Sequence, residues 1–366
     1  MKTALDDLAD LGQSPWLDGI GRGALMSGGL VDLVARGVRG LTTNSALVRG
    51  AITDGDHTDA QRQRLRDVVA GAKDSKQAYL DLAVADARQA CAMLEGTVTG
   101  PGPRDAWVSL EVDPRFAHDV RSTVEEAYLL HRAVDHPRFL VKIPGTVQGL
   151  VAVEEATALG VRVDVSLLFS VFRHRQAAEA YVRGLRRLRD NGGNLRTMSS
   201  VASFSVSHVD AAGDEALRAV GGDPDLAGRL AVANAKIAYR TYKEVFSGMA
   251  WEELSRAGAQ PQWPLWASTS TKDPTFSDVK YVESLIGPDT VITMSRSTIE
   301  AFLDHGRVGP TLEDGVEEAG AVLDGFRRAG VDYDTLTGHL EKAGIRDFNR
   351  SFTEMLKELA ALGPGR

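Results

Sequence analysis

Lys142 lies inside the apolar run Phe139–Pro144, where a charged side chain is costly unless it is paired or loses its charge. Desolvation lowers the pKa of a lysine and makes its amine a useful nucleophile near neutral pH. Such an amine can form a Schiff base with a carbonyl substrate. Taken alone, the segment favours a lysine at a strand end whose amine reaches solvent. The other polar residues of the chain reverse that preference.

Most of the other candidate residues close short apolar runs like the one around Lys142. Each is typical of a strand-end cap or turn when taken singly. Together they supply carboxylates, an amide and hydroxyls, and such a set around one lysine could form an imine and move protons. The candidates are Asp18, Thr42, Asn44, Glu111, Asp164, Ser166, Ser203, Ser205, Ser268 and Thr293.

The elements that must position these residues are eight short apolar runs separated by helical patterns. The runs are rich in Val, Leu and Ile without strict alternation, as expected for strands covered on both faces. Alternating strands and helices predict a parallel sheet, and eight such units favour a closed (β/α)8 TIM barrel of the class I aldolase type, whose active site forms at the carboxyl ends of the strands. The predicted strands are 15–18, 38–43, 106–112, 139–143, 161–167, 197–204, 262–267 and 289–294.

Two regions are longer than the barrel units require. Residues 50–105 are predicted to hold two extra helices, and residues 336–362 are predicted to form helices packed on the outside. No linker, repeat or low-complexity tract interrupts the chain, so residues 1–366 are predicted to form one domain. His174 is predicted on a helix surface.

Composition limits the function classes. The chain has 366 residues, 43% of them hydrophobic, with a formal net charge of −8. The acidic balance argues against a general nucleic-acid binder, and no apolar stretch is long enough to span a bilayer. The acidic N-terminus is unlike a signal peptide, and the single cysteine excludes an internal disulfide, so a cytoplasmic location is expected.

The sequence indicates neither a nucleotide site nor a metal site. Gly19–Ala24 matches a dinucleotide fingerprint, but the next predicted strand ends near Asn44 and not in an acidic residue. These glycines therefore favour a loop. The histidines are scattered and form no metal-ligand spacing, so no catalytic metal is expected.

The strand-end segments resemble the transaldolase family in its longer bacterial form. The likeness includes Gly-Leu-Thr-Thr-Asn at 40–44, Val-Lys-Ile-Pro-Gly-Thr at 141–146 and Val-Asp-Val-Ser-Leu-Leu-Phe-Ser at 163–170. Further matching segments follow in the family's order, and several motifs in register are far more specific than one. They are 16–18, 108–114, 180–185, 200–204, 265–269, 271–272, 281–282 and 304–306.

The resemblance implies a (β/α)8 barrel that works through a class I mechanism without a metal or organic cofactor. Lys142 then matches the Schiff-base lysine that attacks a ketose phosphate. Asp18 matches the general base for carbon–carbon cleavage, and Asn44 matches the residue that holds the dihydroxyacetone fragment. Glu111 matches a carboxylate that shuttles protons through a water, and Ser166 stands where the family has a threonine that holds this water.

The chain departs from the family around the expected substrate. His208 stands in place of an arginine that binds phosphate, and Ser205 replaces an aromatic residue, while Lys272 keeps a second basic position. Histidine lacks the fixed charge and the bidentate grip of arginine. Asp164 replaces an asparagine, and a carboxylate there would hold Lys142 protonated unless Asp164 is itself protonated. The residues expected to bind substrate are Asn44, Thr42, Asp164, Ser203, Ser205, His208, Ser268 and Lys272.

Three hypotheses follow from these residues. The first is a transferase that moves a dihydroxyacetone unit from a ketose or ketose phosphate to an aldose, with altered specificity and a role in specialised metabolism. The second is a Schiff-base aldolase that releases the fragment, and the third is a non-catalytic barrel. Sugars or sugar phosphates are the expected partners, and the resemblance makes a homodimer plausible.

Overall fold

The computed structural model describes residues 2–19, 25, 27–43, 59–98, 100 and 102–362. Eight parallel strands pair in chain order, and β8 pairs back onto β1, which closes a barrel. The (β/α)8 prediction is therefore confirmed. The strands are β1 (Gln13–Asp18), β2 (Gly40–Thr42), β3 (Trp107–Glu111), β4 (Phe139–Pro144), β5 (Val163–Leu168), β6 (Ser200–Ser205), β7 (Gln262–Ala267) and β8 (Thr290–Met294).

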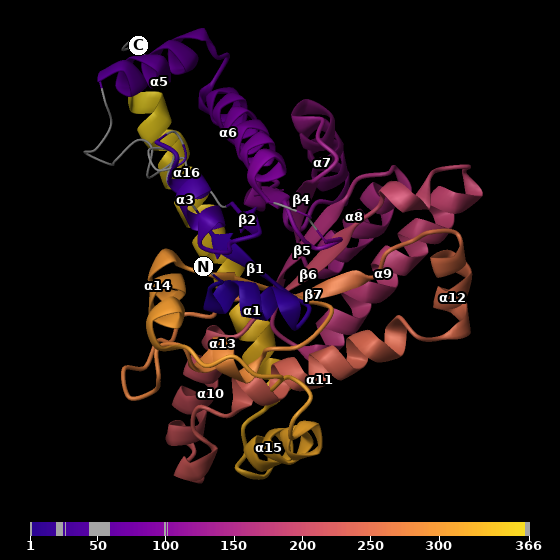
Figure 1. Ribbon diagram of the computed structural model, residues 1–366, viewed down its shortest axis with the longest axis vertical. Helices are drawn as coiled ribbons and strands as arrows, with labels where there is room; N and C mark the ends of the chain where they lie inside the picture. Colours follow the sequence, from indigo (N-terminus) through magenta and orange to yellow (C-terminus); the bar gives the residue numbers. More distant parts are fainter. Residues whose placement is uncertain are drawn as a thin grey trace.

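Helices surround the strands, as Figure 1 shows. The region before β3 holds the two helices α5 and α6, as predicted. Other helices cover the outer face of the barrel. Within the described residues, the helices are α1 (Ala4–Asp10), α3 (Gly29–Ala35), α5 (Asp59–Gly71), α6 (Ser75–Thr97), α7 (Val120–Val134), α8 (Val147–Ala158), α9 (Val171–Asp190), α10 (Ser207–Ala219), α11 (Leu230–Val245), α12 (Met249–Arg256), α13 (Lys280–Ser284), α14 (Arg296–His305), α15 (Val316–Arg328) and α16 (Tyr333–Ala361), with 3-10 turns η1 (Pro114–Phe116), η2 (Leu195–Thr197) and η3 (Pro224–Leu226).

Local chemistry determines where β4 ends and α8 begins. Thr146 caps α8, because its hydroxyl accepts a hydrogen bond from the Gly149 main-chain N–H at 2.8 Å. A Cβ atom at Gly149 would lie 1.8 Å from the carbonyl oxygen of Pro144. Only glycine therefore lets the first turn of α8 pack this closely against the end of β4, the strand that carries Lys142.

The barrel is filled by large side chains, and Trp16 on β1 is the clearest case. Its side chain is fully buried, and its indole N–H donates to Ser14 Oγ and to the carbonyl oxygen of Arg104, each at 3.0 Å. Gly40 pairs with Trp16 across β1 and β2, and a Cβ atom there would lie 2.6 Å from the indole ring. The ring therefore occupies the space that any other residue at position 40 would need.

The C-terminal tail was predicted to form helices packed on the outside of the barrel, but it forms one helix, α16, which also packs against the end of the barrel. A Cβ atom at Gly344 would lie 2.8 Å from Leu167 Cδ2, near the end of β5. The ring of Phe352 meets the Tyr79 ring edge-on with centroids 5.1 Å apart, and the Arg115 guanidinium lies 5.2 Å from it. Leu167 lies near the end of β5 and Arg115 lies in η1, which follows β3, so α16 crosses the carboxyl end of the barrel. Figure 1 shows it passing behind α1 in that view.

His174 on α9 is fully buried, so its predicted surface position was wrong. Its ring meets Phe204 of β6 edge-on at 5.7 Å, because this face of α9 packs on the barrel. Within the described residues neither ring nitrogen has a hydrogen-bond partner. Burial, together with the nearby charge of Arg175, lowers the pKa of His174 to about 4.

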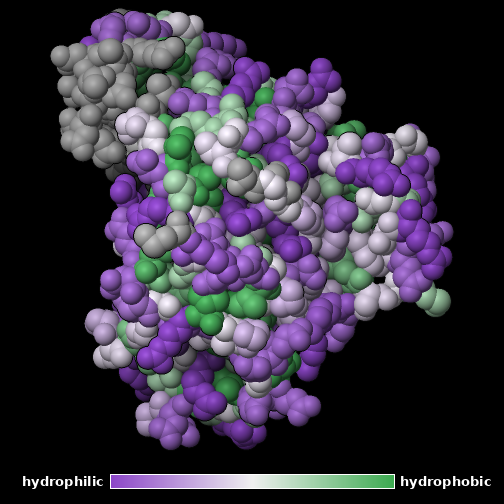
Figure 2. All heavy atoms as spheres, viewed as in Figure 1, coloured by the Kyte–Doolittle hydropathy of each residue, from purple (hydrophilic) through white to green (hydrophobic). Residues whose placement is uncertain are grey.

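Polar and charged side chains cover most of the face seen in Figure 2, with hydrophobic side chains in small groups between them. In the described parts of the chain, no helix combines the length and the apolar character needed to cross a membrane.

Candidate active site

Strand register brings Lys142 between two acidic residues. Lys142 on β4 pairs with Glu111 on β3 and with Asp164 on β5. Paired residues of a parallel sheet point to the same face, so all three side chains share one layer of the barrel. Glu111 and Asp164 are buried and Lys142 is half-buried. The sequence prediction that these residues come together is consistent with this register.

The amine of Lys142 bonds to the main chain after β2 and not to Asp164. It donates to the carbonyl oxygen of Thr43, which follows β2, at 3.3 Å. Lys142 and Asp164 both lie in the described part of the chain, and no ion pair within 4.0 Å joins them. The direct pairing that would hold the lysine protonated is therefore not made.

Two serine hydroxyls bind the Asp164 carboxylate instead. Ser109 on β3 donates to one oxygen and Ser203 on β6 donates to the other, both at 2.6 Å. Ser203 was predicted to bind substrate, whereas Ser109 was missed. Its signal was present, because Ser109 lies two residues before Glu111 and so faces the same side of β3.

Asp18 and Thr42 form a second polar pair at the ends of β1 and β2. Their Cα atoms are register partners, and the Thr42 hydroxyl donates to Asp18 Oδ1 at 3.1 Å. Asp18 is exposed at its strand end while Thr42 is buried. The hydroxyl thus orients a carboxylate that remains accessible at the carboxyl end of the barrel.

Ser166 and Gly145 join the exits of β4 and β5. Ser166 is buried two residues beyond Asp164 and so faces the same side of β5. Its carbonyl oxygen accepts a hydrogen bond from the Gly145 main-chain N–H at 2.7 Å. This bond fixes the height of Ser166 relative to the strand that carries Lys142.

The remaining predicted residues lie on the rim formed by β6, β7 and their following segments. Ser205 is buried at the end of β6, and His208 is exposed in the first turn of α10. Ser268 has a left-handed backbone, with φ of 55°, and its carbonyl oxygen accepts from the Ser207 main-chain N–H at 3.0 Å. Lys272 is exposed in the segment after β7.

The electrostatic surroundings of His208 favour its neutral form. Although the ring is exposed, neighbouring atoms partly desolvate it and lower its pKa, and the charge of Lys272 lowers it further. Asp347 on α16 acts in the opposite direction, but the net shift is downward from the ordinary value. Near neutral pH, His208 therefore brings no fixed positive charge to the rim.

Asn44 and the segment 20–24 lie outside the described residues. Thr293 is buried in β8, and its hydroxyl donates to the carbonyl oxygen of Trp266 at 3.3 Å, which is a structural contact.

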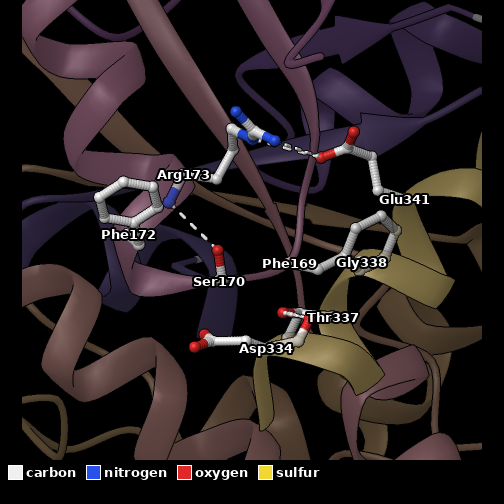
Figure 3. Close-up of a pocket in the computed structure, with 8 residues that line it drawn as sticks. All are labelled: Phe169, Ser170, Phe172, Arg173, Asp334, Thr337, Gly338 and Glu341. Carbon is white, nitrogen blue, oxygen red and sulfur yellow. Dashed lines mark hydrogen bonds and ion pairs between the residues drawn. The ribbon is translucent and has the colours of Figure 1, made fainter. Parts of the chain in front are cut away.

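A cavity of about 470 Å³ lies between the first turns of α9 and α16. Figure 3 shows Arg173 of α9 directed at Glu341 of α16, an ion pair of 3.2 Å, with Phe172 beside it. None of the predicted site residues in the described part of the chain lines this cavity. It is a feature of the α9–α16 contact and not of the barrel interior.

Comparison with known proteins agrees with this arrangement. The model of the family described as transaldolase/fructose-6-phosphate aldolase matches residues 15–359. A transaldolase of Thiobacillus denitrificans is 41% identical over 356 residues, covering 96% of this chain and 98% of that protein. Transaldolase 1 of Streptomyces coelicolor is 42% identical, covering 96% of this chain and 93% of its own length, and transaldolase 2 of the same organism is 40% identical over all of both chains. The chain therefore belongs to the transaldolase/fructose-6-phosphate aldolase family.

Proposed function

We propose that this protein is a transaldolase-like transferase in which the amine of Lys142 attacks the keto carbon of a ketose. The observation that carries the proposal is the half-buried lysine placed in register between two acidic residues at the carboxyl half of a closed barrel. Loss of water from the adduct leaves a positively charged iminium, which draws electrons from the neighbouring carbon–carbon bond.

Asp18 is the proposed base for the cleavage step. It takes the proton from the C4 hydroxyl, the C3–C4 bond breaks, and an aldehyde leaves. The bonding electrons pass to the iminium and give a neutral enamine on Lys142. Thr42 orients Asp18 through its hydrogen bond of 3.1 Å. An aldose then takes up the enamine carbon, and hydrolysis releases the new ketose.

Glu111 and Ser166 are the proposed partners for the protons that move during imine formation and hydrolysis. Both are buried, and both come from strands next to β4. Two carboxylates on different strands can hold different pKa values, so that one serves cleavage and the other serves the imine steps. By resemblance, Asn44 would hold the hydroxyl groups of the fragment.

We further propose that the substrate's distal end is bound differently from that of a typical sugar phosphate. His208 is neutral near pH 7 and Lys272 is the remaining basic residue of the rim. Ser205 and Ser268 provide hydroxyls suited to a polyol, whereas the hydroxyl of Ser203 already donates to Asp164. Sugars and sugar phosphates therefore remain the expected substrates, and the site should prefer phosphorylated sugars less strongly than a site that has an arginine at position 208.

Borohydride trapping tests the proposal. The protein is incubated with fructose 6-phosphate and with a panel of other ketoses, reduced, and mapped by mass spectrometry. A dihydroxyacetone-sized adduct on Lys142 is expected, which the substitution Lys142→Ala removes. Lys357→Ala, which changes an exposed lysine of α16, should leave the adduct unchanged. Absence of an adduct with every ketose would overturn the proposal and leave a non-catalytic barrel.

An aldolase that releases free dihydroxyacetone is the second candidate. The observation that favours it is Ser205, a small buried hydroxyl at a position where the family usually has an aromatic side chain. Product analysis without an aldose acceptor separates the two, because only the aldolase turns over repeatedly. The single domain, the cytoplasmic location and the homodimer remain predictions.

A further inference from the structure

Asp164 poses a problem for a lysine that must attack as a free amine. Neighbouring strands of a sheet lie about 4.8 Å apart, and Asp164 is the register partner of Lys142. A carboxylate that reached the amine would favour its protonated form. Protonated lysine has no electron pair with which to attack a carbonyl.

The structure nevertheless keeps the two groups unpaired. Each carboxylate oxygen of Asp164 accepts one hydroxyl, from Ser109 on one side and from Ser203 on the other. Both bonds are 2.6 Å long, at the short end of the range for hydrogen bonds donated by a hydroxyl. All three side chains are buried, so water does not compete for these bonds.

We propose that Ser109 and Ser203 are positioning residues that hold the Asp164 carboxylate away from the amine of Lys142. The two serines come from β3 and β6, on opposite sides of β5 and β4, and together they fix both oxygens of the acid. Lys142 is thereby left to the Thr43 carbonyl at 3.3 Å and stays available for attack. The inference rests on the proposed nucleophilic role of Lys142.

Other titratable groups also face this lysine and must be held constant in a test. Glu111 adjoins it from β3, and Asp18 stands at the end of β1. Neither is changed in the variants below, so their effects cancel in the comparison. The variants therefore differ only in whether the Asp164 carboxylate is present and held by Ser109.

The test measures the reactivity of Lys142 without any sugar. Wild-type protein, Ser109→Ala, Asp164→Asn and the double variant are treated with formaldehyde and cyanoborohydride at a series of pH values. Mass spectrometry of the peptide that carries Lys142 gives the midpoint of its methylation, since only the neutral amine reacts. Ser200→Ala is the matched control, because this buried serine donates to the Val163 carbonyl at 2.8 Å and not to Asp164.

The expected result is an upward shift of the midpoint in Ser109→Ala by about one pH unit, which slows methylation about tenfold below the midpoint. Adding Asp164→Asn should cancel the shift, and Ser200→Ala should show none. Ser109→Cys, which is slightly larger than serine and keeps a weaker donor at the same place, should shift the midpoint less than Ser109→Ala and guards against misfolding of that variant.

An unchanged midpoint in Ser109→Ala, or an equal shift with and without Asp164, would overturn the inference. The outcome is separable from that of the proposed function. Formaldehyde reports the lysine alone, whereas failure to trap any ketose would refute the enzymatic role even if the methylation midpoints moved as expected.

Discussion

Replacing His208 with arginine should restore a preference for phosphorylated substrates. The imidazole is neutral near pH 7, because its surroundings and the charge of Lys272 lower its pKa. An arginine in the same turn of α10 would carry a permanent charge and could bind phosphate through two N–H groups. The charge of Lys272 already acts on position 208, so the two cations could act on one phosphate.

The size of the effect follows from the position of the residue. Two unit charges 4 Å apart interact by about 4 kcal/mol near a protein surface. Position 208 is exposed, which weakens this interaction, and the charge of Asp347 on α16 opposes part of it. A charge-assisted hydrogen bond contributes about 1.5 to 3 kcal/mol, so we expect a gain of roughly 10- to 100-fold.

The assay compares kcat/KM for fructose 6-phosphate with kcat/KM for fructose. The ratio of the two values should rise in His208→Arg and should fall in Lys272→Ala. In wild-type protein the ratio should rise only as the pH drops below the ordinary histidine range, since His208 then gains its charge, whereas His208→Arg should lose this pH dependence. His136→Arg adds the same charge before β4, at the opposite end of the barrel, and should leave the ratio unchanged.

An unchanged ratio in His208→Arg would refute the reasoning that phosphate is bound at this rim. An equal rise in His136→Arg would do so as well, because it would show a general effect of net charge. A rise in kcat for both substrates, without a change in their ratio, would indicate repositioning of the barrel mouth instead of phosphate binding.

Two further predictions concern stability. Gly40→Ala should lower the free energy of unfolding in urea by about 2 to 3 kcal/mol, because the new Cβ would lie 2.6 Å from the Trp16 ring. The control Gly71→Ala has open space around the new Cβ and should not destabilise the protein. Equal effects of the two substitutions would show that the crowding at position 40 relaxes freely. His174→Phe should reduce acid sensitivity: the folded pKa of about 4 lies below the unfolded value of 6.5, so the unfolded state binds the proton first as the pH falls. Between pH 7.5 and 5 wild-type protein should lose roughly 2 kcal/mol through this group, and the same loss in the variant would contradict the assignment.

The eight strands could be predicted because a parallel barrel strand is covered on both faces and reads as a continuous apolar run. The sequence pattern located the first and last residues of the strands less accurately. The predicted strand 197–204 includes Thr197, which closes the 3-10 turn η2, and β6 begins only at Ser200. Turn and strand residues there are equally apolar or hydroxylated, so the pattern did not distinguish them.

In the candidate site, too, some features could be predicted from the sequence and others depend on the arrangement of the strands. Lys142, Glu111 and Asp164 are each visible in the sequence as polar residues within apolar strand runs. They share one layer because the strand register pairs Lys142 with both acids, although Asp164 is only the second residue of β5. The role of Ser109 depends on the relative height of β3, β5 and β6, which is set by the stagger of the closed barrel and not by any local pattern. The burial of His174 likewise depends on which face of α9 meets β6.

The crossing of α16 over the carboxyl end of the barrel has a consequence for how the protein is made. All eight strands precede residue 295, while the helix that covers their exits ends at Ala361. On a ribosome, the strands can emerge and close before this helix is free to dock, since domains fold from the N-terminal side during synthesis. The mouth of the barrel thus acquires this wall only after α16 has been synthesised and has left the ribosome, so the nascent chain passes through a stage at which α16 does not yet cover the mouth.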